Sequence, residues 1–516
     1  MIRYLLAGAF LTVLVLCVYS QTVDFSFVGF DDPRLVTENG HVRQGLTTAG
    51  ARWSLLAAWR ENVFFYPLSL LSHMADVSWF GLNAGRHHLT SVVLHTAAVL
   101  IFFTWLARLS RAFWRPLLAA GFFGLHPLAV DSVAWVAERS NVLCGLLLFA
   151  TMAAYVQYRQ ARHRRWYGLS LGFYLLALLA KPTAVVAPVG LWLIHRPVAD
   201  TPLESGKRRP GIRTVAAALW PFILLAGLRT LAVLAATRGG SPLTDDHVVT
   251  FGLLTANALV ATATYILYVF YPFRLSVYYP FPESLPLWQP LAAGVMLLAI
   301  TLAAFGYGRR RPLVLLGWLW YLAFLAPSLG VVRSGPWPAM ADHYAYLPLA
   351  GLFIMLVWGF WPSLSAPRQC RTAAIAAGLL TLMYFAGVSF WHVGHYRDSV
   401  SLFSRAIVLD PENFFAYTGL GNAFRGQGKM ELAEAQFRKA VVLKPDSAGA
   451  HHNLGLILME KGEWALAERH FKTALALDPG FSQAQKNLRR LYLEQTAGAA
   501  LATDRPTSEN NATGPP

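Results

Sequence analysis

Twelve apolar segments follow one another along the first 395 residues, and they constrain the fold of this chain more than any other feature. Only 14% of its 516 residues are charged and 55% are hydrophobic, whereas soluble globular chains carry about 25% charged residues. Apolar runs of about 18 residues or more can cross a bilayer. The composition therefore excludes a soluble enzyme for most of the length and predicts an all-α, polytopic membrane bundle. The segments are residues 3–20, 88–107, 116–130, 140–158, 167–180, 183–195, 213–235, 251–271, 288–306, 312–330, 346–361 and 373–391.

Arginine clusters alternate with these segments and predict the topology. Lys and Arg concentrate in the cytoplasmic loops of membrane proteins. The net charge of +16 therefore reflects loop placement, and we do not expect nucleic acid as a partner. Arg3 places the N-terminus inside, and residues 3–20 are predicted to be a retained first span. The clusters lie at 108–115, 159–165, 196–213, 309–311 and 368–371.

The order of the basic loops also predicts how many segments cross the membrane. Segment 213–235 leaves a basic loop, and segment 288–306 runs inward to the cluster at 309–311. The intervening segment 251–271 must then begin and end outside, so we expect an interfacial or re-entrant helix there. This leaves eleven spans, with the C-terminal domain outside. Of the fourteen acidic residues in 1–395, twelve fall on the predicted outer side, which suggests chemistry on that face.

A polar repeat follows the membrane domain. Pro411, Pro445 and Pro479 recur every 34 residues, which is the tetratricopeptide period. The predicted domains are 1–395 in the membrane, a helical repeat solenoid over 396–496 and a disordered tail over 497–516. Such repeats bind peptides or partner proteins, or they act as spacers and dimerisation modules, because the repeat specifies a fold and not a ligand.

The first outer loop, residues 21–86, contains two adjacent carboxylates. In such a pair, each charge opposes the ionisation of the other, which suits a general base that deprotonates an acceptor hydroxyl. Alternatively, Asp32 and Pro33 simply begin a turn or a helix, with Asp32 as the N-cap. The residues alone leave both readings of Asp31 and Asp32 open. The amphipathic stretch 49–80 predicts two short helices on the outer surface.

The second outer loop, residues 126–143, carries a further polar group. Asp131 and Glu138 are seven residues apart and share a helix face, with Trp135 beside them. Polar residues at the mouth of a bundle are candidates for function. The alternative is structural, with Asp131 as an N-cap and Glu138 in a surface pair with Arg139.

Basic groups elsewhere on the outer side are candidate ligands for a lipid phosphate. They are Lys181, Arg333 and the His343 segment. Arg229 lies inside an apolar run and is either a snorkelling cation or a phosphate ligand. No metal-ligand set stands out, and Cys17, Cys144 and Cys370 form neither a disulfide framework nor a zinc site.

Together these motifs resemble the transmembrane and tetratricopeptide-repeat-containing O-mannosyltransferase family, including its bacterial relatives. The resemblance covers nearly the whole chain, and the run from His126 to Leu143 is its most specific part. It implies a GT-C type glycosyltransferase that moves a sugar from a polyprenyl-phosphate carrier to an outer acceptor, with inversion. The other matching stretches are residues 30–33, 66–68, 83–95, 180–182, 343–348 and the C-terminal repeats.

The resemblance also implies roles for particular residues. Asp31 or Asp32 would be the base, and the departing phosphate would be held by Arg139, Lys181, Arg333 or His343. His126, Asp131, Trp135 and Glu138 would shape the sugar and acceptor pocket. Relatives often carry Glu where this chain has Asp131, and we expect Arg where it has His343.

The expected reaction is transfer of a hexose such as mannose to an acceptor hydroxyl, with Ser or Thr of proteins as the favoured acceptor. The lipid-linked sugar is a substrate, no cofactor is expected, and a divalent metal is not indicated. We expect a bacterial inner membrane protein with periplasmic repeats that receive protein acceptors, or alternatively an endoplasmic reticulum protein with lumenal repeats. The competing reading is a non-catalytic scaffold whose repeats recruit partners. A transporter is disfavoured, because most charges lie at span ends.

Overall fold

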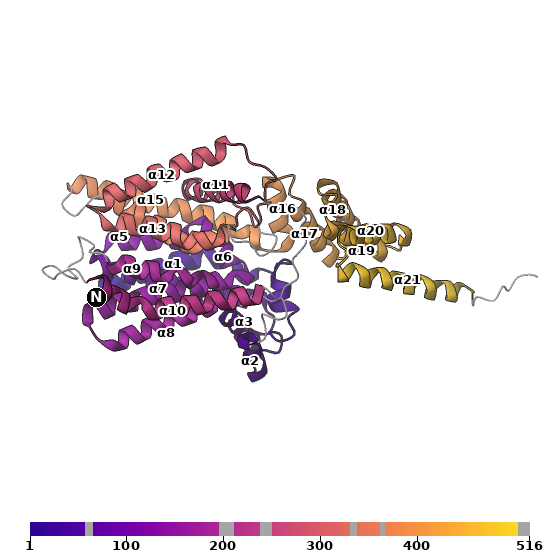
Figure 1. Cartoon of the computed structure of the whole chain (residues 1–516), viewed down its shortest axis with the longest axis horizontal. Coiled ribbons are helices and arrows are strands. Elements are labelled where there is room, and N and C mark those ends of the chain that lie inside the picture. Colours follow the sequence, from indigo (N-terminus) through magenta and orange to yellow (C-terminus); the bar gives the residue numbers. More distant parts are fainter. Residues whose placement is uncertain (57–65, 196–210, 238–249, 331–337, 362–366, 504–516) are drawn as a thin grey trace, which may run out of the picture. The chain divides into compact units, whose positions relative to one another are not determined.

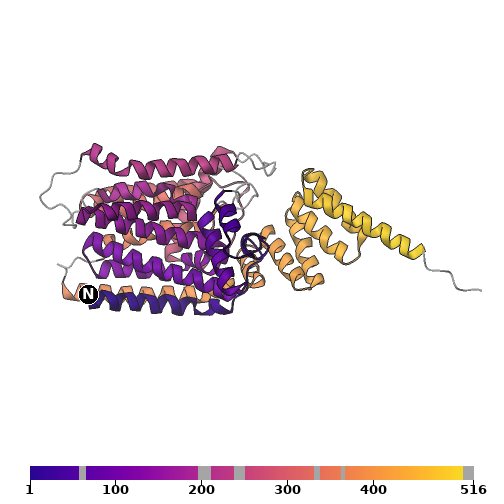
Figure 2. The ribbon, with the colours of Figure 1, turned by 90° about the horizontal axis from the view of Figure 1, so that it is seen from below.

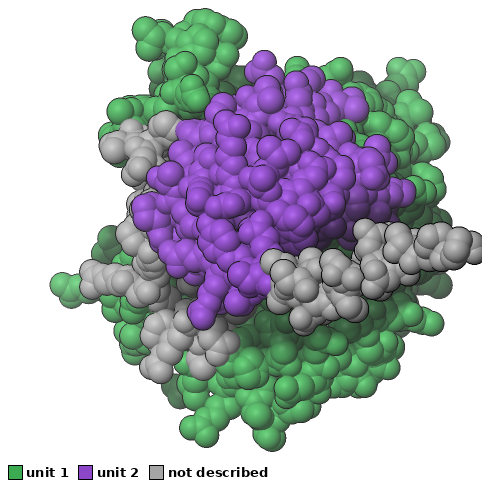
Figure 3. All heavy atoms as spheres, turned by 90° about the vertical axis from the view of Figure 1, so that its right-hand side faces the viewer, with its two compact units in different colours: residues 1–405 green, residues 406–516 purple. Residues whose placement is uncertain are grey.

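The structure, a computed structural model, describes residues 1–56, 66–195, 211–237, 250–330, 338–361 and 367–503. The chain forms two compact units, residues 1–405 and 406–516 (Figure 3). The boundary falls after the predicted position at 395. The helix after the last apolar segment, α16 (Ser399–Leu409), is tied to unit 1 through a hydrogen bond from the Gly29 amide to Ser399 Oγ (2.8 Å).

Unit 1 is built from helices that run side by side (Figures 1 and 2). Each of the twelve apolar segments coincides with a helix, and the described residues form no strand, so the predicted all-α class is confirmed. These helices are α1 (Ile2–Tyr19), α4 (Ala84–Ser110), α5 (Trp114–Leu125), α7 (Arg139–Ala161), α8 (Arg164–Ala180), α9 (Ala187–His195), α10 (Ile212–Thr237), α11 (Phe251–Phe270), α12 (Trp288–Gly308), α13 (Pro312–Leu325), α14 (Tyr346–Phe360) and α15 (Arg368–Val393).

The described helices include eight that are long and apolar enough to cross a membrane. A ninth span arises if α5 and the short helix α6 (Val130–Ala134), bent by 56° between them, count as one. The chain is therefore a multi-pass membrane protein. The number eleven stays a prediction, because α9 and α13 are shorter than a bilayer is thick.

The two ends of the bundle differ in composition. At the basic end, Arg115 donates a hydrogen bond to the Trp361 carbonyl, and Arg311 donates to the carbonyls of Trp358 and Gly359. At the opposite end, which we call the loop end, the chain leaving α1 meets the chain leaving α15. There the Ser26 amide donates to the Arg397 carbonyl at 2.9 Å. This pairing supports the prediction that the first loop and the repeats lie on one side of the membrane.

Helix α11 contacts the loop end through both of its halves. Asn257 Nδ2 donates to the Ala339 carbonyl (2.9 Å), and Tyr265 OH donates to the Ala341 carbonyl (2.7 Å). The two donors are eight residues apart, yet they reach carbonyls only two residues apart. These contacts agree with an interfacial or re-entrant helix, which stays a prediction.

The first outer loop contains the two short helices predicted for 49–80, within the described residues. They are α2 (Thr48–Leu56) and α3 (Pro67–Phe80), and they gather with α6 at the end of the bundle away from the N-terminus (Figure 1). A single helical turn, η2 (Pro33–Thr37), precedes them and begins directly after the two aspartates. The loop thus folds over the end of the bundle where α6 lies.

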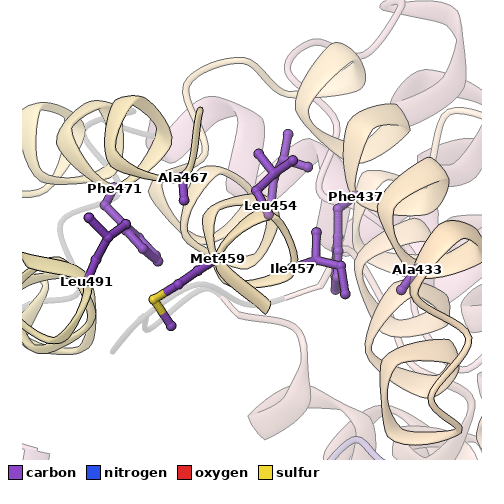
Figure 4. Close-up of a cluster of buried hydrophobic side chains, with 9 residues drawn as sticks. Ala433, Phe437, Leu454, Ile457, Met459, Ala467, Phe471 and Leu491 are labelled. Atoms are coloured by element: carbon purple, nitrogen blue, oxygen red, sulfur yellow. The ribbon is translucent and has the colours of Figure 1, made fainter. Parts of the chain in front are cut away.

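Unit 2 consists of paired helices, as the repeat period predicts. They are α17 (Phe414–Gly426), α18 (Met430–Leu443), α19 (Ala448–Glu460), α20 (Trp464–Leu477) and α21 (Ser482–Thr503). Phe437 and Phe471 are fully buried in one core with Ile457 and Leu491 (Figure 4). Helix α21 extends to Thr503, so the first part of the predicted disordered tail is helical; residues 504–516 lie outside the described residues.

Helices α13 and α14 cross at very short range in unit 1. A Cβ atom on Gly351 would lie 2.5 Å from the Gly317 carbonyl oxygen and 2.8 Å from the Tyr321 amide nitrogen. Both are backbone atoms and cannot rotate away. This crossing fixes α14, and the chain that enters α14 forms part of the site described below.

We predict that Gly351→Val prevents normal packing, since overpacking against backbone costs at least 1–3 kcal/mol. Gly294→Val on α12 is the matched control, because a Cβ there meets nothing within 4 Å. Size-exclusion profiles and thermal unfolding of the purified proteins in detergent measure the effect. Equal stability of the two variants would contradict the close crossing.

Candidate functional site

Glu138 connects three segments at the loop end. It ends the turn η5 (Val136–Glu138), directly before α7. Lys181 Nζ, which follows α8, lies 3.1 Å from Glu138 Oε2, and His343 Nε2 lies 3.7 Å from Oε1. Asn141 donates a further hydrogen bond to Oε2. Glu138 is therefore a carboxylate with only 13% of its side chain exposed, held between two basic side chains.

Asp131 holds His343 from the other side. The His343 amide and its Nδ1 lie 2.9 and 2.8 Å from Asp131 Oδ2. Tyr396 OH donates to Asp131 Oδ1 at 2.8 Å. Asp131 is fully buried within α6 and does not cap that helix. The described structure thus forms a continuous polar chain of alternating groups: Tyr396, Asp131, His343, Glu138 and Lys181.

Trp135 packs against Phe30 of the first outer loop and against His343. Its ring stacks on Phe30 with centroids 5.1 Å apart, and it meets the His343 ring edge-on at 5.9 Å. Phe30 directly precedes the two aspartates. The stacking therefore holds the first outer loop against Asp131 and Glu138, two residues predicted for the sugar and acceptor pocket.

Asp32 is a structural side chain in this fold. It is fully buried, and its two oxygens accept hydrogen bonds from the amides of Val28 and Ala137, both at 2.8 Å. Burial raises the pKa of Asp32 to about 7, while the two amides act in the opposite direction. The residue precedes η2, with Pro33 as the first helical residue, but its side chain makes no cap hydrogen bond. The cap hypothesis is thus correct for the position and wrong for the side chain, which instead joins the two outer loops.

Asp31 has a different environment, although it is the adjacent residue. Its side chain is half-buried, and within the described residues its carboxylate has no hydrogen-bond donor. The pKa of Asp31 is raised from 3.8 to about 6, first by burial and then by the negative charge of Glu138, against the lowering effect of Arg34, His343 and Lys181. Asp31 thus belongs to the same electrostatic group as Glu138 and keeps both carboxylate oxygens available.

Beside Lys181 lies Tyr66, which the sequence analysis did not place in the site. The Lys181 Nζ lies 5.8 Å from the centre of the Tyr66 ring. Burial is the largest single effect on the pKa of Lys181 and lowers it, but the charge of Glu138, the charge of Tyr66 and the hydrogen bond to Glu138 together outweigh it, so that the net shift is upward. Tyr66 also interacts electrostatically with Arg229, a buried cation on α10. In the sequence, the signals that could have located these two residues were the Tyr66-Pro67 pair and the single arginine within an apolar run.

Arg139 does not join this group. Its guanidinium is fully buried and pairs with Asp76 Oδ2 at 2.6 Å. It also donates to Ser91 Oγ, Ser72 Oγ and the His87 carbonyl. The alternative of a Glu138–Arg139 surface pair is wrong, because Arg139 is fully buried and the two residues pair with different partners. Through these contacts, Arg139 holds α3 and α4 to α7.

His126, another residue predicted for the pocket, lies apart from the group. His126 is fully buried, accepts the Leu128 amide at Nδ1 and lies 3.1 Å from the Val269 carbonyl through Nε2. It therefore fixes the bend between α5 and α6 and links it to α11. Arg333 lies outside the described residues. No three His, Cys, Asp or Glu side chains in the described ranges are grouped closely enough to hold a metal ion.

The comparisons with known proteins agree with both parts of this architecture. Residues 421–462 match a family model described as TPR repeat, and residues 448–481 match one described as Tetratricopeptide repeat. The predicted tetratricopeptide repeats are thus confirmed.

Up to 82% of the chain is similar to curated relatives, all of which are named protein O-mannosyl-transferases. It is 25% identical over 484 residues, 81% of this chain and 64% of the relative, to protein O-mannosyl-transferase TMTC4 of Mus musculus. The corresponding human protein is 25% identical over 493 residues, 82% of this chain and 64% of the relative. Protein O-mannosyl-transferase Tmtc1 of Drosophila melanogaster is 29% identical over 193 residues, 35% of this chain and 21% of the relative.

These findings confirm the resemblance that the sequence motifs indicated. The chain is similar to the two vertebrate O-mannosyl-transferases along about four-fifths of its own length, and it spans 64% of theirs. The similarity extends across the membrane domain, where the charged group around Glu138 lies.

We predict that Asp32→Asn leaves unit 1 less stable than Asp31→Asn. Both substitutions remove a carboxylate whose pKa is raised, but only Asp32→Asn puts an NH₂ in place of an acceptor and leaves a backbone amide unpaired, at a cost of about 1–3 kcal/mol. Asp31→Asn is the control of identical chemistry. The folded-state pKa of Asp31, about 6, exceeds its ordinary value of 3.8. The protonated Asp31 therefore stabilises the fold at low pH, and this contribution is lost as pH rises from 3.8 through about 6. At pH 7.5 the Asp31→Asn variant, which is neutral, is at least as stable as the native chain. Thermal unfolding in detergent compares the two, and equal losses would contradict the assignment.

Proposed function

We propose that this chain is a membrane glycosyltransferase that moves a hexose, mannose in the first instance, from a polyprenyl-phosphate carrier to a Ser or Thr hydroxyl of a protein. The names of the relatives support the reaction class. The observation that carries the proposal is the position of Asp31: a half-buried carboxylate without a hydrogen-bond donor in the described structure, among the charges of Glu138, Lys181 and His343.

Asp31 is the general base of this proposal, and Asp32 is its structural neighbour. The acceptor hydroxyl oxygen attacks the anomeric carbon while the bond from that carbon to the phosphate oxygen breaks. The hydroxyl proton passes to Asp31, and the electron pair of the broken bond leaves with the phosphate. Attack from the face opposite the phosphate inverts the anomeric centre. A base whose pKa is about 6 is ionised at neutral pH and still accepts a proton readily.

The leaving phosphate carries the charge that develops during the reaction, and cations stabilise it. Lys181 and His343 are the described residues in the best position, because both lie against Glu138 close to Asp31. Arg229, which interacts electrostatically with Tyr66, is a further phosphate ligand, and Arg333 stays a candidate from the sequence. Arg139 is left out, since its partner is Asp76. The pocket residues are Asp131, Trp135 and Glu138.

No cofactor takes part in the proposed reaction, since the lipid-linked sugar is a substrate. The basic end of the bundle suits the cytoplasmic face, so the site and the repeats face the other side. We place the chain in a bacterial inner membrane, with the endoplasmic reticulum as the alternative. The repeats are proposed to receive the protein acceptor.

The test is sugar transfer in reconstituted vesicles. We predict that Asp31→Asn lowers transfer from labelled polyprenyl-phosphate mannose at least about 100-fold, the lower range for loss of a general base. Asp31→Glu, which restores a carboxylate, retains more activity. All proteins are first shown to be folded by size exclusion. A native chain that transfers no hexose from any polyprenyl donor would instead favour the non-catalytic scaffold.

The pH profile provides a second test of the base. Asp31 must be ionised to accept a proton, so transfer per unit of enzyme rises as pH increases through about 6 and levels off above 7. Glu138→Gln removes a negative charge that raises the pKa of Asp31. It also frees Lys181 from its ion pair, and the positive charge of Lys181 lowers the pKa of Asp31. The rise of the variant therefore moves to lower pH. A profile that is flat between pH 5 and pH 8 would contradict Asp31 as the base.

A further inference from the structure

A second group of basic side chains lies at the loop end of α15, where the proposed reaction does not use it. His392 and His395 flank the end of this helix, and their ring centroids are 5.9 Å apart. The Trp391 ring meets His395 edge-on at 4.7 Å. Arg405 of α16 lies over the same indole, with its guanidinium carbon 4.9 Å from the ring centre. Trp391 therefore holds the two histidines and the arginine in one cluster.

Several polar atoms of this cluster have no partner. Within the described residues, both ring nitrogens of His392, Nε2 of His395 and Nε of Arg405 are buried without a hydrogen bond. The His392 side chain is only 2% exposed. Buried polar groups in folded proteins are almost always paired, so four unpaired atoms in one cluster require an explanation. All three side chains are donors or can become donors, and an acceptor would satisfy them.

The surrounding residues supply little negative charge. No carboxylate forms an ion pair with His392, His395 or Arg405 in the described structure, and the one protein acceptor is the Phe273 carbonyl, 2.6 Å from the Arg405 guanidinium. Two other carboxylates at the loop end pair elsewhere or point to no cation of the cluster. Asp131 accepts from Tyr396 and His343, and Asp342 accepts from Tyr279 at Oδ1, while its Oδ2 has no hydrogen-bond partner among the described residues. The cluster therefore lacks a counter-anion.

The cluster borders an apolar surface of the kind that faces lipid. Phe390 and Trp391 are 50% and 45% exposed, and Phe270 and Tyr271, at the end of α11, are 64% and 59% exposed. Along α15, Leu379, Leu380 and Met383 are also exposed. Aromatic side chains beside a basic residue mark the level of lipid headgroups in membrane proteins. An acyl chain can lie on these apolar residues while its phosphate reaches Arg405.

We propose that Arg405 and His395, backed by His392, form a binding site for the phosphate group of a membrane lipid at the loop end of α15. Arginine suits this ligand because its planar fork matches the oxygens of a phosphate. The site is separate from the group around Glu138, since Tyr396 lies between His392 and Asp131 and directs its hydroxyl to Asp131. The proposal does not depend on the glycosyltransferase activity. A soluble phosphate has the same chemistry, and the experiment distinguishes the two sources.

The test uses the full chain purified in detergent and three additives: dioleoyl phosphatidylglycerol, dioleoylglycerol and inorganic phosphate. Native mass spectrometry counts bound molecules, and thermal unfolding measures stabilisation. Phosphatidylglycerol is expected to bind and to raise the unfolding temperature, whereas dioleoylglycerol, which has the same acyl chains and no phosphate, is not. Stabilisation by millimolar inorganic phosphate alone would show that the site takes a soluble ion, and the lipid assignment would be wrong.

The matched variants are Arg405→Gln and Arg397→Gln. Both remove one positive charge from the same stretch, but Arg397 is exposed, with 66% of its side chain accessible, and lies beside Asp398. Arg405→Gln is expected to weaken phosphatidylglycerol binding at least tenfold, and Arg397→Gln to leave it unchanged. Equal binding by Arg405→Gln and the native chain would overturn the proposal. Should Arg405→Gln fail to fold, His395→Gln replaces it, with the same expected loss and the same contradicting result.

Discussion

The loop end of this protein depends on the ion pairs that the Glu138 carboxylate makes. A buried charge is tolerated only when it is paired, and removing one partner of such a pair typically costs about 3–5 kcal/mol. Glu138 meets this requirement with Lys181 and His343, which come from separate parts of the chain. His343 in turn requires Asp131, which requires Tyr396. The starts of α7 and α14, the end of α8 and the exit from α15 are therefore held together by one set of charges.

The two neighbouring aspartates show how the same side chain acquires different tasks. Asp32 gives both oxygens to backbone amides and joins the first outer loop to the second. That attachment holds Asp31 beside the Glu138 group without using its carboxylate. The chain can thus keep an accessible carboxylate close to two cations. Phe30, which stacks on Trp135, fixes the same loop from its other side.

The sequence predicted the local features well and the long-range pairings poorly. Hydropathy located the twelve helices, and the proline spacing located the repeats, because both signals lie within short windows. The pairing of Arg139 with Asp76 joins residues that lie 63 positions apart, and that of Asp32 with the Ala137 amide spans 105. Neither pairing leaves a mark in composition or spacing. Arg139 was accordingly predicted to bind phosphate, whereas its charge is engaged inside the fold. Tyr66 was noted only as part of a motif, because its position beside Lys181 depends on how α3 returns to the bundle.

The most direct measurement is a cryo-electron microscopy structure of the full chain in nanodiscs with bound polyprenyl phosphate, the leaving group of the proposed reaction. The account predicts density for the phosphate in contact with Lys181 and His343, on the side of Glu138 that faces Asp31, with Arg139 still paired to Asp76. Phosphate density at Arg139, or density separated from Asp31 by the Trp135 ring, would contradict the account. In that case Asp31 could not act on a sugar held by this group.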